Sequence, residues 1–361
     1  MNTPACCLAI LVSGSIFCAA NAQDPCGERK RSLQKVATND HYSWFTINKV
    51  FNWYGNNGNS SYNKVRSNSG LEYPAGSGKC AIFKDGLVWG GFHKGRAIPK
   101  VGGATYTYGL QAGAILTPGG PGESERPVAD DPMLAKYRVY CVRPDVTPAT
   151  SFDAVKAKMQ AEADLIGRFS TATANEVFQR YIQDWNEWPA KDGLPAPYKD
   201  ENGDGKYDPA IDIPGRAGAD QTLYYVANDL NAVRTQGFSG SPPIGLEMHR
   251  TVWGYTLEGP LASTVFSSTV LINKSGAVLD SAFLVQWSDP DLGYSADDYS
   301  GCDVDRNLGY VYNSPTIDNE YEWRSRPLAT ISCRGPGSPP AIFPIRPYSW
   351  GHTARATDPC R

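Results

Sequence analysis

The sequence predicts a mainly β, β-sandwich-like fold with a helical insertion, so that the class is α+β overall. Three observations carry this prediction. The chain has 36 glycines, 20 tyrosines and 9 tryptophans but 4 methionines, which favours tight turns and aromatic cross-strand pairs over helical bundles. Short apolar runs alternate with glycine clusters along much of the chain. A helical period of apolar residues appears in one stretch, residues 151–188.

Residues 1–22 have the pattern of a secretory signal peptide. An apolar run from Cys7 to Phe17 precedes Ala19-Ala20-Asn21-Ala22, which predicts cleavage after Ala22. The run carries no preceding Lys or Arg and is too short to span a bilayer. A lipidated Cys18 is the alternative. We expect a secreted, extracellular or cell-surface protein without a transmembrane segment, because no later stretch is apolar over the roughly 18 residues that a spanning helix needs.

Residues 23–150 are expected to form a β-rich N-terminal part. Aromatic and β-branched residues between Tyr42 and Trp53 predict its first strands. The tract from Gly55 to Gly70 is rich in Asn, Ser and Gly, which predicts a loop that buries little. A surface loop is expected over residues 118–132. Further strands are predicted at residues 81–83, 86–91, 105–110 and 137–142, at a spacing typical of a sandwich.

Residues 151–188 are expected to be the helical insertion. Apolar residues recur at helical spacing from Phe152 to Ile166 and again from Val177 to Trp185. Thr173-Ala174-Asn175-Glu176 fits a capping box at the start of the second helix. We therefore expect two helices, joined near residues 167–173.

Residues 189–334 are expected to combine a calcium-binding loop with a second β-rich part. The run from 263 to 273 places apolar residues on both faces, which predicts an inner strand. Residues 335–361 are rich in proline at first and lose the strand pattern, so an irregular tail is expected, and this ending resembles that of a truncated product. The predicted strands are 223–226, 245–257, 263–273 and 281–287.

The strongest chemical motif is the Asp-x-Asn-x-Asp-Gly loop that begins at Asp200. Ca²⁺ takes roughly six to eight oxygen ligands, which alternate oxygen-bearing side chains and a turn glycine can supply. Ile211 stands where an EF-hand has a bidentate Glu, so we expect weak, extracellular-range affinity. A solvated turn without an ion is the alternative. The predicted ligands are Asp200, Asn202, Asp204, the carbonyl of Lys206, and Asp208 or Asp212.

A second acidic cluster follows the predicted strand that ends at Trp287. Dense like charges are costly unless they are solvated or neutralised by a cation, so Asp289 and Asp291 are predicted metal ligands or parts of a solvated loop. The same pair could instead serve a glycosidase, whose two acids lie about 5 to 10 Å apart. The cluster continues with Asp297, Asp298, Asp303 and Asp305.

Other function classes receive little support from the sequence. The net charge of −3 gives no basic footprint, so nucleic acid is not an expected partner. The four histidines are scattered, and no Gly-x-Ser-x-Gly elbow or Walker loop occurs, so an enzyme is less favoured. His249 is expected to be a satisfied strand residue. Five tryptophans could stack on sugars but more often such residues fill a core: Trp44, Trp53, Trp89, Trp185 and Trp188.

Six of the nine cysteines follow the leader, and in an exported chain an even number permits disulfides. Spacing selects none of the possible pairings, although the short loop makes Cys302–Cys333 the first candidate. The six are Cys26, Cys80, Cys141, Cys302, Cys333 and Cys360.

A series of short motifs follows in order along residues 40–315. They are Gly70-Leu71-Glu72-Tyr73-Pro74, 86–91, Asp184-Trp185 with Trp188-Pro189, the Asp200 loop, 218–222, Asn228-Asp229, 243–247, Asn273-Lys274-Ser275 and 287–293. This series resembles the N-terminal region of large secreted proteins of the Bacteroidetes, many of which end in a type IX secretion sorting domain. The resemblance implies secretion and residence at or beyond the cell surface, and it implies no particular activity. No sorting domain is recognised in this sequence.

The sequence thus predicts a secreted or cell-surface, non-enzymatic structural or adhesive domain with calcium-binding loops. The alternative is a secreted glycan-binding or glycan-hydrolysing protein that uses Asp289 and Asp291. Polysaccharides or cell-surface components are the expected partners.

Overall fold

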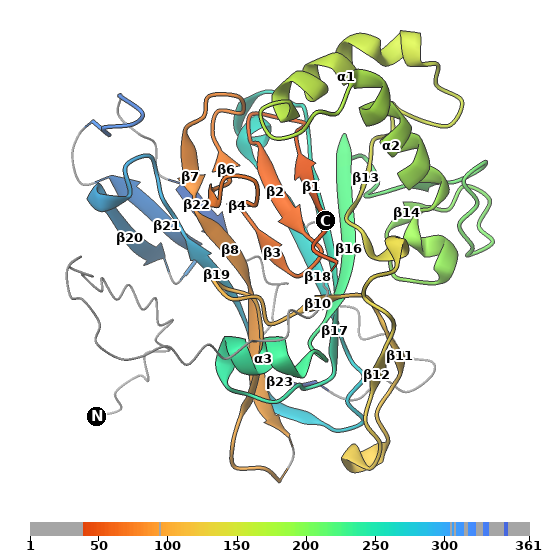
Figure 1. Ribbon diagram of the computed structural model, residues 1–361, viewed down its shortest axis with the longest axis vertical. Helices are drawn as coiled ribbons and strands as arrows, with labels where there is room; N and C mark the ends of the chain where they lie inside the picture. Colours follow the sequence, from red (N-terminus) through yellow and green to blue (C-terminus); the bar gives the residue numbers. More distant parts are fainter. Residues whose placement is uncertain are drawn as a thin grey trace, which may run out of the picture. The chain divides into compact units, whose positions relative to one another are not determined.

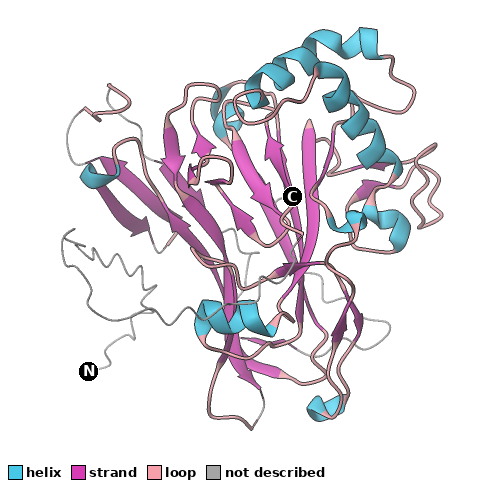
Figure 2. Ribbon diagram, in the orientation of Figure 1, coloured by secondary structure: helices cyan, strands magenta, loops and turns pink. Residues whose placement is uncertain are grey.

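The computed structural model describes residues 39–93, 95–303, 305–306, 308–313, 317–322, 328–331 and 343–345. The fold is mainly β, with 35% of the described residues in strands of antiparallel sheets and 19% in helices, of which three are α-helices (Figures 1 and 2). This confirms the predicted class. The expected signal peptide and most of the expected tail lie outside the described residues.

Two antiparallel sheets hold most of the long strands. The larger, seven-stranded sheet has the order β1 (Tyr42–Phe45), β2 (Asn52–Gly55), β3 (Asn59–Ser60), β8 (Lys84–His93), β19 (Leu279–Asp289) and β23 (Phe343–Ile345), and β9 (Lys100–Gly103) also pairs with β8. The five-stranded sheet has the order β10 (Gln111–Ala112), β16 (Gln221–Asn228), β17 (Leu246–Gly254) and β18 (Phe266–Asn273), and β13 (Tyr140–Val142) also pairs with β16.

The two sheets pack against each other over one hydrophobic core. Trp53 and Trp89 of the larger sheet and Leu223 and Met248 of the smaller one belong to the same cluster of buried residues. The sheets approach closely, since a Cβ atom added to Gly254 in β17 would lie 2.4 Å from Cζ of Phe45 in β1. Close packing of this kind is what a sandwich core requires.

Strand β16 is buried on both of its faces. Leu223 and Tyr225 join the main core, whereas Tyr224 and Val226 join two smaller clusters on the opposite face. All eight of its residues are buried. The inner strand of the smaller sheet is therefore β16.

Strand β18, predicted to be an inner strand, is an edge strand. Among the described strands it pairs with β17 alone, and most of its residues are partly exposed. Leu271 packs against the main core, while Val270 and Ile272 stand on the other face, opposite His249 and Glu247 of β17. Each face of this strand is therefore only partly buried. The alternation of side chains along a strand is the same for partial and for full burial, so the sequence pattern could not distinguish the two.

The predicted helical insertion is confirmed by α1 (Phe152–Ile166) and α2 (Ala174–Asn186). The capping box is present: the backbone N–H of Glu176 donates to Oγ1 of Thr173 at 3.3 Å, and that of Thr173 donates to Glu176 Oε2 at 2.7 Å. Both helices contribute to the main core, and they lie side by side in Figure 1. A third helix, α3 (Ala232–Ser239), was not predicted.

Short strands complete the described structure. They are β4 (Tyr62–Asn63), β5 (Asn68–Ser69), β6 (Leu71–Glu72), β7 (Cys80–Ile82), β11 (Ile115–Thr117), β12 (Val128–Ala129), β14 (Tyr198–Lys199), β15 (Ile213–Pro214), β20 (Asp298–Asp303), β21 (Leu308–Asn313) and β22 (Leu328–Ile331). Strand β12 lies within the predicted 118–132 loop, and β23 lies within the predicted irregular tail.

The prediction that residues 55–70 form a loop that buries little is wrong. The tract contains β3, β4 and β5, and six of its polar residues are at most 6% exposed. Two of the asparagines bond to the backbone: Asn56 Nδ2 donates to the Tyr137 carbonyl at 2.7 Å, and Asn63 Oδ1 accepts from the N–H of Val65 at 3.0 Å. Polar side chains can be buried when their hydrogen bonds are met in this way. The six are Asn56, Asn57, Asn59, Ser60, Ser61 and Asn63.

The strand predicted at residues 105–110 is also absent. This segment makes one isolated bridge, between Ala104 and Tyr108, and then closes as the N–H of Gly109 donates to the Gly103 carbonyl at 3.0 Å. Gly103 has a φ of 130°, a conformation that favours glycine, so the chain turns there instead of extending.

Candidate functional site

The predicted calcium loop connects β14 to β15 and folds around its own carboxylates. Asp200 accepts hydrogen bonds from the N–H of Gly203 at 2.7 Å and of Gly205 at 2.8 Å, one on each oxygen. The two glycines have φ of 73° and 74°, and a Cβ at either would meet nothing within 4 Å. Glycine is therefore required at both positions by the left-handed backbone conformation and not by a lack of space. The motif predicted such a turn glycine at Gly205.

The alternate side chains of the motif also bond back to the loop. Asn202 Oδ1 accepts from the N–H of Asp204 at 3.2 Å, and Asp204 Oδ1 accepts from the N–H of Lys206 at 2.8 Å. Further along, Asp208 Oδ1 accepts from the N–H of Ala210 at 2.9 Å. The predicted ligand residues thus lie in one compact turn, with backbone N–H groups beside each of these side-chain oxygens.

Asp212 closes the loop and is nearly inaccessible, at 1% exposure. Its two oxygens accept from the N–H groups of Glu201 at 2.9 Å and Asp208 at 2.7 Å, so it joins the beginning of the loop to its end. Tyr207 donates to the Trp185 carbonyl at 2.6 Å, and Trp185 Nε1 donates to the Pro209 carbonyl at 3.0 Å. The loop is therefore held firmly on the end of α2.

In the part of the chain that the structure describes, no group of three or more His, Cys, Asp or Glu side chains is placed to hold a metal ion. Calcium coordination by the loop would therefore need neutral oxygens as well, from the Asn202 amide and the Lys206 carbonyl. Ca²⁺ accepts such ligands readily. The calcium site stays a prediction.

The second predicted pair lies where β19 ends. Asp289 stands opposite Lys84 of β8 in the sheet register, and Asp291 Oδ2 accepts from Ser69 Oγ at 3.1 Å. Burial raises the pKa of Asp291, and the nearby negative charge of Asp289 adds to the shift. The structure thus brings the two carboxylates close enough to interact.

The rest of that acidic cluster divides. Asp303 pairs with Arg306, whereas Asp297 and Asp298 lie near Asp318, a fully buried residue that the sequence did not single out. Asp318 accepts from Asn313 Nδ2 at 2.6 Å, and the same amide reaches Asp297 at 3.0 Å. Asp318 is distant from Asp297 and Asp298 in the sequence, and backbone N–H groups hold its carboxylate. Such bonds leave no local pattern in the sequence, so only the fold shows that these residues lie together.

Asp298 is the most perturbed of these carboxyls. One oxygen accepts from the N–H of Leu292 at 2.8 Å, while the buried Oδ1 has no hydrogen-bond partner. Burial raises the pKa of Asp298 to about 7, and the charges of Asp297, Asp291 and Asp318 contribute.

Because this folded-state pKa lies above the ordinary value of 3.8, ionisation of Asp298 opposes folding. The protonated Asp298 carboxyl therefore stabilises the folded state. This stabilisation is full below pH 3.8 and is lost as the pH rises to about 7. Asp298→Asn should therefore be more stable than wild type at pH 8, with a smaller difference at pH 4. Urea unfolding at both pH values measures this, with exposed Asp305→Asn as the control. A difference that does not grow with pH would contradict the assignment.

The histidine and tryptophan expectations are confirmed. His249 is 2% exposed, its Nδ1 lies 2.6 Å from the Tyr224 hydroxyl, and its Nε2 lies 2.8 Å from Glu247 Oε1. The five tryptophans considered as sugar-stacking residues are each at most 6% exposed, so they fill the core. They are Trp44, Trp53, Trp89, Trp185 and Trp188.

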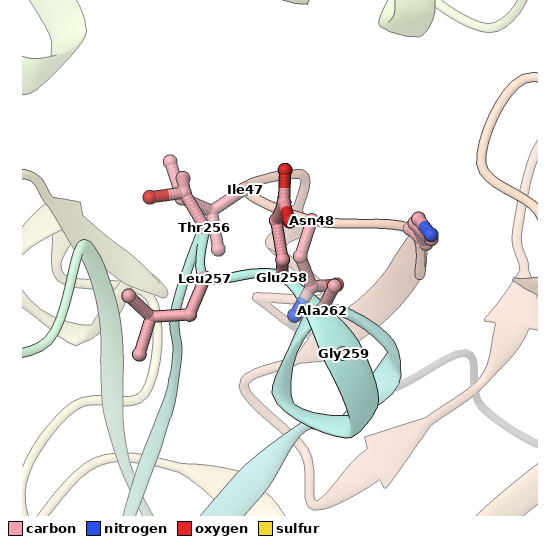
Figure 3. Close-up of a pocket in the computed structure, with 8 residues that line it drawn as sticks. Ile47, Asn48, Thr256, Leu257, Glu258, Gly259 and Ala262 are labelled. Atoms are coloured by element: carbon pink, nitrogen blue, oxygen red, sulfur yellow. The ribbon is translucent and has the colours of Figure 1, made fainter.

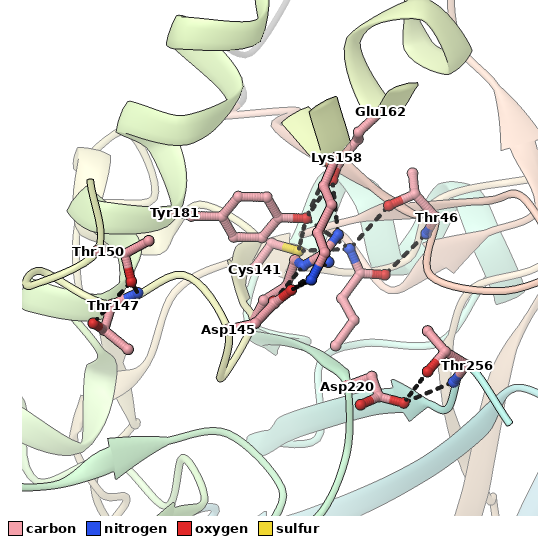
Figure 4. Close-up of polar contacts among 12 residues, drawn as sticks. Thr46, Cys141, Asp145, Thr147, Thr150, Lys158, Glu162, Tyr181, Asp220 and Thr256 are labelled. Carbon is pink, nitrogen blue, oxygen red and sulfur yellow. Dashed lines mark hydrogen bonds and ion pairs between the residues drawn. The ribbon is translucent and has the colours of Figure 1, made fainter. Parts of the chain in front are cut away.

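A polar network between α1, α2 and β16 is buried as well (Figure 4). Tyr181 donates to Glu162 at 2.9 Å and accepts from Gln221 Nε2 at 2.9 Å, and Gln221 Oε1 accepts from the N–H of Thr46 at 2.9 Å. Cys141 lies in the same network, and burial raises the pKa of its thiol to about 12. A thiol held neutral in this way is a poor nucleophile.

Cys80, Cys141 and Cys302 are free thiols in the structure. The predicted partner of Cys302 is Cys333, which lies outside the described residues, as do Cys26 and Cys360. The Cys302–Cys333 pairing stays a prediction.

A shallow pocket of about 460 Å³ lies between the turn after β1 and the segment after β17 (Figure 3). Its ionisable lining consists of Lys49 and Glu258, without a nucleophile and base pair. The lining residues are Ile47, Asn48, Lys49, Thr256, Leu257, Glu258, Gly259 and Ala262.

Sequence reasoning missed a group of aromatic residues beside Asp289, which we call the aromatic patch: Tyr62, Phe83, Tyr106, Tyr108 and Trp287. None of the five belongs to the three clusters of buried apolar residues or to the side chains packed on them. Ring centroids lie 5.7 Å apart for Tyr62 and Phe83, 6.2 Å for Phe83 and Tyr106, and 4.7 Å for Tyr106 and Trp287. The alternation Tyr106-Thr107-Tyr108 is the sequence pattern that could have indicated these exposed rings, but the same alternation also predicts a strand.

No helix among the described residues is long and apolar enough to cross a membrane. The resemblance to secreted proteins of the Bacteroidetes stays a prediction. Comparison of the chain with models of protein families, with curated proteins and with solved structures finds no match in any of the three.

Proposed function

We propose that this protein is a secreted or cell-surface, non-enzymatic domain, adhesive or structural, whose Asp200–Asp212 loop binds Ca²⁺. The observation that carries the proposal is the loop's closed frame, in which Asp200 and Asp212 accept backbone hydrogen bonds on both of their oxygens. A frame fixed in advance reduces the entropy that an ion would otherwise need to overcome on binding.

The charge and oxygen supply of the loop favour a hard divalent cation. Four carboxylates, at positions 200, 204, 208 and 212, lie within thirteen residues, with an amide oxygen from Asn202. Carboxylate and amide oxygens are the ligands that Ca²⁺ prefers. Ile211 brings no oxygen ligand and is 48% exposed, which supports weak affinity of the extracellular kind.

The candidate catalytic groups support a non-enzymatic role. His249 is buried between two hydrogen-bond partners, and Cys141 is a buried, neutral thiol. One observation favours the second candidate, a glycan hydrolase. The pKa of Asp291 is raised, and a second carboxylate, Asp289, lies nearby. A raised pKa beside a second carboxylate is typical of the acid catalyst in a glycosidase. Release of reducing ends by wild type but not by folded Asp291→Asn would support that candidate and contradict the first.

Calcium is expected to raise the melting temperature of the purified protein. At a free concentration ten times the dissociation constant, a ligand of the native state adds about 1.4 kcal/mol, or a few degrees for a chain of this size. Asp204→Asn should remove most of the gain, because it deletes one charge while an amide oxygen can still accept from Lys206. Differential scanning calorimetry in 10 mM Ca²⁺ and in chelator measures the gain.

The matched control is Asp192→Asn, which removes one exposed charge outside the loop and should keep the calcium response. Identical melting curves in calcium and in chelator would refute the calcium part of the proposal.

A further inference from the structure

The aromatic patch has an exposed surface that core packing does not explain. Tyr106 is 57% exposed, and the other four residues are partly exposed. Trp287 meets Tyr106 edge to face, at an interplanar angle of 76°. Opposite Trp287 in the sheet stands Gly86, so β8 places no side chain directly across from the indole.

The patch is rigidly supported from below. Lys84 is 4% exposed and donates to the Tyr106 carbonyl at 2.8 Å. Its ammonium group lies 4.2 Å from the ring centre of Tyr108 and 4.6 Å from that of Tyr62. The cation–π contacts hold both tyrosines, and the hydrogen bond holds the turn that carries Tyr106, so one buried side chain supports all three residues.

Carboxylates border the rings. Burial raises the pKa of the Tyr106 hydroxyl and the neighbouring Asp289 carboxylate adds to the shift, while Asp291 is held by Ser69 at 3.1 Å. Ionised carboxylates only accept hydrogen bonds, so this border suits a ligand that donates several. It also repels anionic ligands, including acidic lipid surfaces and acidic polysaccharides.

Exposed apolar residues extend the patch along β19. Val285 is 50% exposed and Phe283 is 49% exposed, and both share the face of Trp287 in the strand alternation. Phe283 also stands opposite a glycine, Gly90. At about 3.4 Å per residue, the stripe from Trp287 to Phe283 is about 14 Å long. Such a stripe fits an extended chain better than a single small molecule.

We propose that the aromatic patch, with Asp289 and Asp291, binds a neutral polysaccharide. The apolar C–H face of a sugar ring stacks on Trp287 and Tyr106, and its hydroxyl groups donate to the two carboxylates. The uncharged chain avoids the repulsion that an acidic glycan would meet. This inference deepens the adhesive function proposed above and rests on it, but it does not depend on the calcium loop.

Native affinity electrophoresis of the purified chain tests the inference, with soluble hydroxyethylcellulose, β-glucan or mannan in the gel and alginate as the acidic comparison. We expect at least one neutral polysaccharide to retard wild type, and Trp287→Ala to weaken that binding at least about tenfold, as truncation of a tryptophan at the centre of an interface does. Tyr106→Ala, in an exposed turn, is the second variant should Trp287→Ala fold poorly.

The matched control is Tyr299→Ala, because Tyr299 is also an exposed tyrosine, at 54%, and lies in β20 beside Tyr312. It should bind as wild type does. Absence of retardation by every neutral polysaccharide, retardation by alginate alone, or wild-type binding by both patch variants would overturn the inference.

Failure of the inference and failure of the proposed function are distinguishable in the same gels. Reducing ends released from a retarding polysaccharide would contradict the non-enzymatic proposal while leaving patch-dependent binding intact. Loss of binding to every polysaccharide, with the calcium-dependent melting shift retained, would remove the glycan inference and leave the calcium loop standing.

Discussion

Replacing Glu247 with alanine is expected to lower the free energy of unfolding by about 3–5 kcal/mol, as removal of one partner from a buried ion pair does. Glu247 is 1% exposed, and it accepts from Lys274 Nζ at 2.9 Å, from His249 Nε2 at 2.8 Å and from the N–H of Ile115. Its removal would leave the Ile115 N–H and His249 Nε2 inside the protein without this acceptor, and Lys274 would keep the Ile115 carbonyl at 2.7 Å but lose its carboxylate partner. Such losses cost more than the bonds themselves contribute.

The pH dependence of this loss has a defined sign. Burial alone would raise the pKa of Glu247, but the hydrogen bond from His249 and the charge of Lys274 hold it below the ordinary 4.5. Its stabilisation is therefore present above pH 4.5 and is lost as the pH falls below that value. Denaturant unfolding of wild type and variant at pH 7 and pH 3 measures this, with exposed Glu258→Ala as the control. A loss at pH 7 no larger than that of the control would contradict the prediction.

Trp188→Ala is expected to cost about 3–5 kcal/mol, because it removes a fully buried ring. The indole packs between Tyr140 and Tyr224, with ring centroids 6.1 and 5.8 Å away, and its Nε1 donates to the Pro197 carbonyl at 2.9 Å. Trp188→Phe should lose less, since it keeps most of the packing and gives up the hydrogen bond.

Replacing a core tryptophan and replacing a patch tryptophan should have different effects on stability and on polysaccharide binding. Thermal unfolding should show a large loss for Trp188→Ala and a small one for Trp287→Ala, because Trp287 lies outside the buried clusters. Polysaccharide binding, measured at a temperature where both variants are folded, should show the reverse. Equal stability losses in the two variants would mean that Trp287 is a core residue, against the role inferred for it.

Local sequence signals were sufficient for α1, for α2 and for the turn of the Asp200 loop, although α3 was not predicted. The span of α1 follows from its apolar spacing, and Thr173 with Glu176 fixes the start of α2 through bonds made within one turn. The turn at Gly205 follows from the same short-range chemistry. In each case the partners lie a few residues apart, so the sequence alone contains the whole interaction.

Features that depend on distant partners could not be read in this way. Asn56 looks like a loop residue until the Tyr137 carbonyl is known to lie 2.7 Å from its amide. The edge position of β18 depends on which strands pair with it. Side chains alternate with a period of two in edge strands and in central strands alike, so the sequence does not distinguish them. The aromatic patch joins Tyr62 to Trp287 through rings from separate segments, so no single stretch of sequence contains it.

The pairing of β8 with β19 also bears on the time course of folding. Lys84 and Asp289 are neighbours in the sheet, yet they lie roughly 200 residues apart in the chain. High contact order of this kind slows folding, since the entropy of closing a long loop is lost before the contacts form. Until β19 has been synthesised, one side of β8 remains an open strand edge that can pair with another chain. The pairing of β8 with β19 can therefore be completed only after residue 289 has been synthesised, and the larger sheet only after β23 follows.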